Sequence, residues 1–175
     1  KNVILSLVMS AYKIAPCAVS ILEGKGDELF RELRAHKLDL IVSNYPSQAI
    51  EEAQVFSKSV AKLPVSVYGA KKYKNLKTSF PKSLDGKPFV FPTNHSKLRH
   101  DLNHYFKLHG IRTIPVAETQ DTSLQRLLAE HGVGLAPFSE VDDSRNMGLV
   151  QLGRLKDVYE EIWLISAQRK LENPI

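Results

Sequence analysis

Two histidines and an aspartate on one predicted helix have the residue types of a metal site. His100 and His104 stand four residues apart in the sequence HDLNH, beside Asp101. The zinc-protease pattern HExxH needs both histidines on one face, a glutamate as base and a third ligand. Here aspartate replaces glutamate, and both histidines fall on the helix side opposite Leu98 and Leu102. We expect a solvated face, with His100 and His104 only a weak metal option, and no cofactor.

Polar residues follow several predicted strands and form the candidate binding site for a small ligand. In open α/β sheets, ligands bind beyond the carboxyl ends of strands and beside helix N-termini. Each of these residues has helix capping as its ordinary alternative role, above all Thr122, which forms a capping box with Gln125. The candidates are Ser43, Asn44, Thr93, Asn94, His95, Ser96, Asp121, Thr122 and Pro137.

The elements that must position these residues alternate between helix and strand. Apolar spacing predicts a helix over 2–14 and a second helix after Asp27. Strands are predicted at 18–22 and 38–43, and the nearly continuous apolar run of the latter indicates a parallel strand covered on both faces. This order is typical of a doubly wound α/β lobe.

A second lobe of similar design is predicted from residue 88 onward. The strand at 89–91 ends at Pro92, a polar loop follows, and a helix runs from there to the stop at Gly110. Another strand, helix and strand complete this lobe, and two further strands are expected at 148–152 and 158–166.

The composition and the missing motifs exclude several classes of function. The 175 residues carry a mild net charge of +5, and their single cysteine, Cys17, indicates a reducing compartment. No apolar run is long enough for a membrane helix. The sequence also has no phosphate-loop pattern and no GxSxG nucleophile motif, so we expect a protein that is not an enzyme.

The sequences HKLDLIVSNYP, PFVFPTN and HGVGLAPF, in this order and spacing, resemble the effector-binding domain of LysR-type transcriptional regulators. The tail GRLKDVYEEIWLISAQRKLENP, together with HKLDLIVSN, is similar to the branch that activates sodium/proton antiporter genes in response to sodium. The likeness extends along essentially the whole chain.

The resemblance implies an α/β fold of two Rossmann-like lobes, periplasmic-binding-protein-like of type 2, joined by two crossover strands. Lobe I would comprise residues 1–63 and 158–175, and lobe II, inserted between them, residues 64–157. By the resemblance, promoter DNA would be bound through an N-terminal winged helix-turn-helix, which we expect to be absent from this chain. The expected hinge residues are Pro64, Val65, Lys156 and Val158.

The function that the resemblance implies is effector sensing and dimerisation in a cytoplasmic transcriptional activator. Asn44 and Thr93 match positions that commonly contact effector, and the first helix and the lobe II helices would form the homodimer interface. Hydroxyl and amide oxygens with Glu118 and Asp121 would suit a hard cation such as sodium, whereas converging helix N-termini would suit a small anion. The alternatives are a solute-binding protein of transport and a small enzyme of the same fold.

Overall fold

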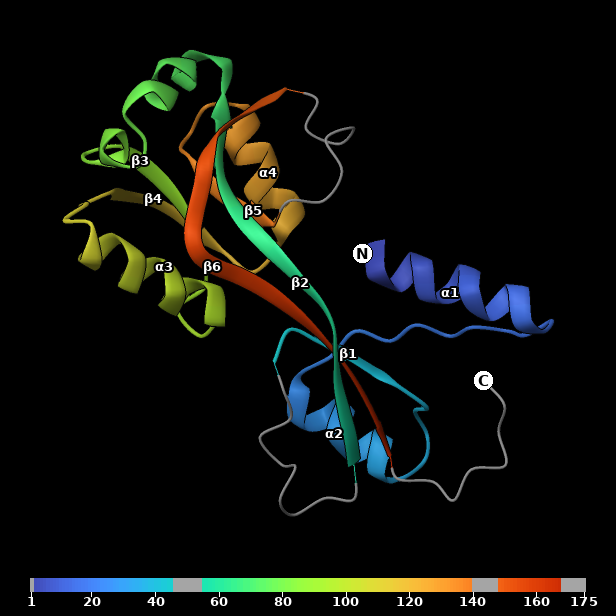
Figure 1. Cartoon of the computed structure of the whole chain (residues 1–175). Helices are drawn as coiled ribbons and strands as arrows, with labels where there is room; N and C mark the ends of the chain where they lie inside the picture. Colours follow the sequence, from blue (N-terminus) through green and yellow to red (C-terminus); the bar gives the residue numbers. More distant parts are fainter. Residues whose placement is uncertain (1, 46–54, 140–147, 168–175) are drawn as a thin grey trace. The chain divides into compact units, whose positions relative to one another are not determined.

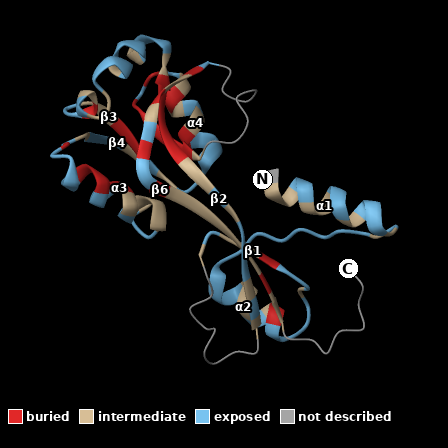
Figure 2. Ribbon diagram, viewed as in Figure 1, coloured by how far each residue is buried: buried red, intermediate tan, exposed pale blue. Residues whose placement is uncertain are grey.

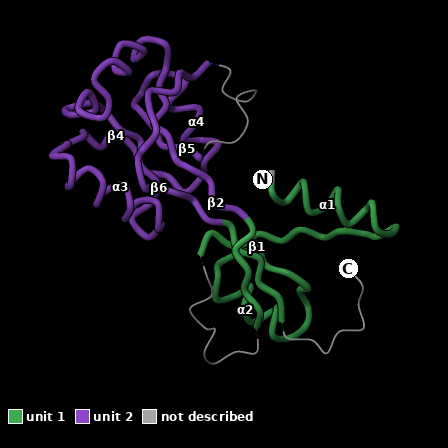
Figure 3. Tube along the Cα trace, viewed as in Figure 1, with its two compact units in different colours: residues 1–60, 162–175 green, residues 61–161 purple. Residues whose placement is uncertain are grey.

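The chain divides into two units. A computed structural model describes residues 2–45, 55–139 and 148–167 (Figure 1). Unit 1 comprises residues 1–60 and 162–175, and unit 2 comprises residues 61–161 (Figure 3). These boundaries differ by a few residues from the expected lobes, so all four expected hinge residues lie within unit 2, in long strands. The last residues of the expected lobe I, 168–175, fall outside the described residues.

Unit 1 contains two helices and a short strand. Helix α1 (Asn2–Ile14) has the predicted bounds, and α2 (Gly26–Arg34) is followed by β1 (Ile41–Ser43). Strand β1 pairs with the final strand β6 (Leu149–Ala167) in antiparallel register, with Ile41 opposite Ile165. Both isoleucines are buried with Leu33 of α2, and these three side chains form the small core of this unit.

Two predictions for unit 1 are wrong. Residues 18–22 form no strand, and the described neighbour of β1 is antiparallel instead of parallel. The apolar side chains of this segment, including Ile21 and Leu22, are exposed. A strand exists only where a partner completes its hydrogen-bond ladder, and the described residues supply none to this segment. Without that neighbour, β1 has β6 alone to pair with.

Unit 2 is built around a parallel pair of strands. Strands β3 (Pro88–Pro92) and β4 (Ile114–Thr119) pair in parallel, with Pro92 opposite Thr119. Strand β2 (Val55–Ala70) pairs antiparallel with β5 (Ala136–Ser139), and the Val90 amide donates to Leu135 O at 2.7 Å. The helical elements are the 3-10 helices η2 (Lys71–Ser79) and η3 (Lys82–Leu84), α3 (Lys97–Leu108) and α4 (Thr122–Glu130).

The core of unit 2 lies between β3 and α3. Phe89 is fully buried, and its ring contacts those of Phe91 and Phe106 at centroid distances of 4.7 and 5.4 Å. Leu102 and Tyr105 of α3 are also buried there, as the helical spacing predicts, and Figure 2 shows the buried residues concentrated in this unit. Burial raises the pKa of the Tyr105 phenol, and a backbone hydrogen bond from Lys156 opposes the shift.

Strand β6 is continuous where two separate strands were predicted. Gly153 lies inside it, and a Cβ at this position would stand 2.5 Å from the Phe80 ring. The glycine therefore permits a close approach and does not mark a turn. The bend that the strand does make is at Asp157, whose φ is 64°.

Candidate functional site

Two loops of unit 2 lie at one edge of the parallel strand pair. The first, residues 93–96, joins β3 to α3, and the second, residues 120–121, joins β4 to α4. Because β3 and β4 run parallel with Pro92 opposite Thr119, their carboxyl ends meet and the loops are neighbours. The structure thus brings together six of the predicted binding residues, namely Thr93, Asn94, His95, Ser96, Asp121 and Thr122.

The 93–96 loop presents polar groups at the start of α3. Ser96 is the N-cap, and its hydroxyl oxygen accepts a hydrogen bond from the Arg99 amide at 3.1 Å. The Ser96 amide in turn donates to Thr93 O. Within the described chain, the Thr93 hydroxyl and the Asn94 side-chain amide carry no hydrogen bond. These two side chains are the available donors and acceptors of the loop.

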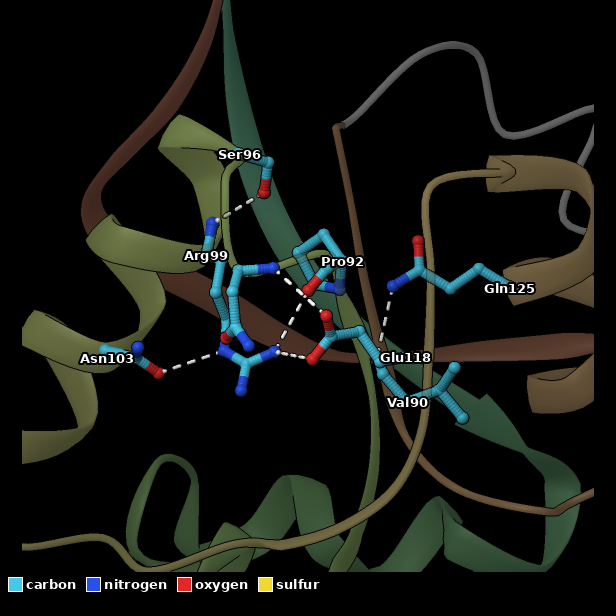
Figure 4. A network of polar contacts seen from close by, with 8 residues as sticks. Val90, Pro92, Ser96, Arg99, Asn103, Glu118 and Gln125 are labelled. Carbon is cyan, nitrogen blue, oxygen red and sulfur yellow. Dashed lines mark hydrogen bonds and ion pairs between the residues drawn. The ribbon is translucent and has the colours of Figure 1, made fainter.

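An ion pair fixes the loop against β4. Glu118 accepts from the Asn94 amide through Oε1 at 3.1 Å and from Arg99 Nη1 through Oε2 at 3.0 Å. The same Arg99 nitrogen donates to Pro92 O at 3.0 Å, and Arg99 Nε donates to Asn103 Oδ1 at 3.3 Å (Figure 4). The side chain of Arg99 is 13% exposed, and its guanidinium lies over the Phe91 ring. One arginine therefore holds the end of β3, the end of β4 and the first turn of α3.

Replacing Glu118 by glutamine is expected to loosen the 93–96 loop. The variant loses the charge that pairs with Arg99, and its amide oxygen is a weaker acceptor for the Asn94 amide. Because Glu118 is partly exposed, we expect the free energy of unfolding to fall by only about 1 kcal/mol. Hydrogen exchange at the Asn94 amide should accelerate. The control is Glu130→Gln, which removes a carboxylate that forms no ion pair among the described residues. Equal exchange rates at Asn94 in both variants would contradict the role of Glu118.

The N-cap of α4 is Asp121 and not Thr122, so the predicted capping box is wrong. Asp121 Oδ1 accepts from the Ser123 amide at 2.7 Å and from the Leu124 amide at 3.3 Å. Gln125, expected to close the box, is 4% exposed, and its Nε2 donates to Val90 O at 3.0 Å. A carboxylate one residue earlier is the better acceptor for the first-turn donors, which frees the glutamine for the core.

The other predicted residues belong to other elements. Ser43 is the last residue of β1 in unit 1 and Asn44 follows it, and Ser43 Oγ accepts from the Tyr45 amide at 3.0 Å. Pro137 is fully buried within β5, opposite Val67. Their contact with an effector stays a prediction.

The histidine pair on α3 is exposed. His100 and His104 both face solvent, and the described residues hold no group of three His, Cys, Asp or Glu side chains that could bind a metal ion. In the described part of the chain, helices also fall short of the length and hydropathy that crossing a membrane requires.

Sequence reasoning missed the roles of Arg99 and Gln125. Arg99 stands on the first turn of α3 and pairs with a strand residue that follows it by 19 positions, so no local spacing reveals the pair. The spacing of Gln125 from Thr122 fits a capping box, so the sequence predicts a capping role for this side chain. Its neighbours gave a partial signal, since Leu128 and Ala129, three and four residues later, share its side of the helix.

The chain is similar in sequence to curated transcriptional activators. The chain is 25% identical over 162 residues to the transcriptional activator protein NhaR of Escherichia coli (strain K12) and of Shigella flexneri. The match covers 91% of this chain and 53% of each relative, so the chain spans about half the length of the curated relatives it matches.

Solved structures of LysR regulatory domains have the same fold. The regulatory domain of CcmR from Synechocystis PCC6803, in complex with 2-PG, superposes with a TM-score of 0.75 at 14% identity, covering 99% of this chain and 85% of that one. The regulatory domain of HypT from Salmonella typhimurium gives 0.73 at 15% identity, with coverages of 97% and 83%. This is the expected periplasmic-binding-protein-like fold of type 2. The LysR substrate binding domain model matches residues 16–175, and the chain belongs to that family.

Proposed function

We propose that this chain is the effector-sensing and dimerisation domain of a NhaR-like transcriptional activator, acting in the cytoplasm as a switch without catalysis. The family of regulators to which it belongs supports this role. Promoter DNA would be bound through the winged helix-turn-helix that the family implies. A transport solute-binding protein is not favoured, since the relatives found are regulators.

The effector that the 93–96 loop suits best is a small organic anion. The observation that carries this proposal is the use already made of both nearby carboxylates. Glu118 accepts hydrogen bonds with both oxygens, from the Asn94 amide and from Arg99, and Asp121 Oδ1 accepts both capping bonds of α4. Of the oxygens of these two carboxylates, only Asp121 Oδ2 is without such a bond among the described residues, whereas a hard cation needs several oxygen ligands. The first turn of α3 contains no acidic residue, so its N-terminus retains its attraction for an anion.

Sodium remains the second candidate because of the likeness to NhaR and the expected sodium response of that branch. A direct sodium site at the 93–96 loop would have Asp121 Oδ2 as its carboxylate ligand, or would have to displace Glu118 from its present partners. Sodium would otherwise act on the full-length protein through another region. Ser43 and Asn44 of unit 1 stay candidate effector contacts of that unit, whereas Pro137 is left out because its side chain is buried.

Thermal unfolding tests the effector class. The chain is unfolded at constant ionic strength in sodium, lithium or potassium, and then with a panel of small carboxylates. A ligand present at about 100 times its dissociation constant stabilises the folded state by about 2.7 kcal/mol. We expect this stabilisation from one carboxylate. We also expect the chain to be equally stable in sodium and in potassium. Stabilisation by sodium alone would overturn the anion assignment.

Replacing Thr93 by valine is expected to weaken binding of that carboxylate about tenfold. The change keeps the side-chain shape and removes one hydrogen bond to a charged group, worth about 1.5 kcal/mol. Isothermal titration calorimetry measures the dissociation constant. Thr78→Val, at an exposed position of η2, is the matched control and should bind as the unchanged protein does. If both variants bind alike, the Thr93 hydroxyl does not contact the effector.

The dimer proposal rests on two exposed apolar surfaces. On α1, Leu5, Met9 and Tyr12 repeat at helical spacing and are each at least 50% exposed. We call these three residues the α1 stripe. The polar residues of this helix are confined to Asn2, Ser6, Ser10 and Lys13. A helix that is apolar on most of its circumference is stable in water only when covered.

The second surface, the α4 patch, consists of Leu124 and Leu127 on α4 and Ile114 and Val116 on β4. All four side chains are more than 40% exposed. In a two-fold dimer, the α1 stripe of each protomer would cover the α4 patch of its partner, so that both surfaces are buried twice. A closed arrangement of this kind leaves neither apolar surface free for further assembly.

A further inference from the structure

A depression of about 530 Å³ lies in unit 2, apart from the effector site proposed above. Its volume is in the range of about 300–1,000 Å³ common for small-molecule sites. Helix α3 from its first turn to its end, the turn that follows it and the strands β3 and β4 form its walls. None of the predicted binding residues lines it. We call it the α3 pocket, and the lining residues that matter here are Phe91, Arg99, Phe106, Lys107, Arg112 and Pro115.

The charges around the α3 pocket are all positive. Arg99, Lys107 and Arg112 line it, and no acidic residue does. Among the described residues, the side chains of Lys107 and Arg112 have no ion pair or hydrogen bond, and the Nη2 group of Arg99 has none either. Two carboxylates contact residues of the lining: Asp85 accepts from the Arg112 backbone amide at 2.7 Å, and Glu118 pairs with Arg99 Nη1 at 3.0 Å. Three cationic groups with unused donors favour an anion.

The floor of the pocket is apolar. Phe91 and Phe106 are 3% and 5% exposed, and their rings meet edge to face. The last carbonyls of α3 do not present free acceptors there. Tyr105 O accepts from His109, Phe106 O from the Ile111 amide and Lys107 O from the Gly110 amide. The surroundings therefore suit a ligand with one anionic group and an apolar or aromatic body.

We propose that the α3 pocket binds a small carboxylate with an apolar body, and that its occupant acts on the 93–96 loop through Arg99. The arginine lines the pocket and also pairs with Glu118, which holds the Asn94 amide. An anion bound at Nη2 competes with Glu118 for the same guanidinium charge. Occupancy of the pocket thereby weakens the contact that fixes the loop. Binding in the α3 pocket is independent of the proposed function. The effect of that binding on effector sensing rests on the proposed function.

Titration with benzoate, followed by amide chemical shifts, tests the binding. Saturable shifts are expected at Gly110, Ile111 and Thr113, with none from benzyl alcohol, which has the same ring and no charge. The double variant Lys107→Gln, Arg112→Gln should raise the dissociation constant at least about tenfold, since charge-assisted hydrogen bonds are the stronger kind. Lys74→Gln, Lys82→Gln removes the same charge from exposed positions outside the pocket and should leave it unchanged.

Two further variants separate this proposal from the proposed function. Benzoate binding that survives Thr93→Val and is lost in the Lys107, Arg112 double variant supports the pocket. The reverse pattern assigns benzoate to the 93–96 loop and overturns the pocket, as does the absence of saturable shifts. If the pocket is coupled to the 93–96 loop, saturation with benzoate should also change the chemical shift of the Asn94 amide. This change should be smaller in Glu118→Gln, while the changes at Gly110 and Thr113 persist. An unchanged Asn94 amide in the unsubstituted protein would overturn the coupling.

Discussion

Replacing Phe89 by alanine is expected to lower the free energy of unfolding by about 3–5 kcal/mol, the range for truncating a buried phenylalanine. Phe89 is fully buried, and its ring contacts Phe91 and Phe106, so the change leaves a cavity between β3 and α3. Urea unfolding followed by circular dichroism measures the loss. Because β3 leads directly into the 93–96 loop, effector affinity should fall as well.

The chain contains a matched control for this substitution. Phe56 has the same side chain on β2 and is 58% exposed, so Phe56→Ala should change the free energy of unfolding by no more than about 0.5 kcal/mol. Similar losses in the two variants would mean that Phe89 does not hold the core described here.

Placing glutamates on the α4 patch is expected to separate the dimer. Each leucine fully removed from an apolar interface costs about 1.5–3 kcal/mol, and every 1.4 kcal/mol changes a dissociation constant about tenfold. Leu124→Glu with Leu127→Glu should therefore raise the dimer dissociation constant by about 100-fold or more. Sedimentation equilibrium over a range of concentrations measures it. The reciprocal pair, Leu5→Glu with Met9→Glu on the α1 stripe, should act alike.

Leu108 provides the control for the dimer prediction. It ends α3, is 69% exposed and lies outside both apolar surfaces, so Leu108→Glu should leave the association unchanged. Dimers that persist in both double variants would contradict the proposed pairing of the α1 stripe with the α4 patch. A protein that is monomeric before substitution would contradict the dimer itself.

The sequence predicted the helices and strands of unit 2 better than it predicted which of their residues contact one another. The apolar run at 88–92, the polar loop and the periodic helix after it were each identified because their signals are local. Arg99 and Glu118 meet only because β3 and β4 run in parallel, which residue spacing does not report. The family likeness supplied the two-unit fold, which periodicity alone did not.

The wrong predictions share a physical origin. The apolar segment at 18–22 has strand propensity, but a strand depends on a partner that propensity cannot supply. The sequence predicts two strands, at 148–152 and 158–166, whereas β6 is continuous and the missing side chain of Gly153, inside it, makes room for the Phe80 ring. Gln125 has the spacing of a capping residue and reaches the Val90 carbonyl instead. In each case the outcome depends on whether distant residues meet, and the local signal does not report that.

The division of the chain has a consequence for the order in which the protein folds during synthesis. Unit 2 is one uninterrupted stretch, residues 61–161, and can form once the chain up to residue 161, within β6, has left the ribosome. Unit 1 combines the first 60 residues with residues after 161, and its strand β1 pairs with the last part of β6. The beginning of the chain must therefore wait for the end. Until then Leu33 and Ile41 lack Ile165, with which they form the core of unit 1.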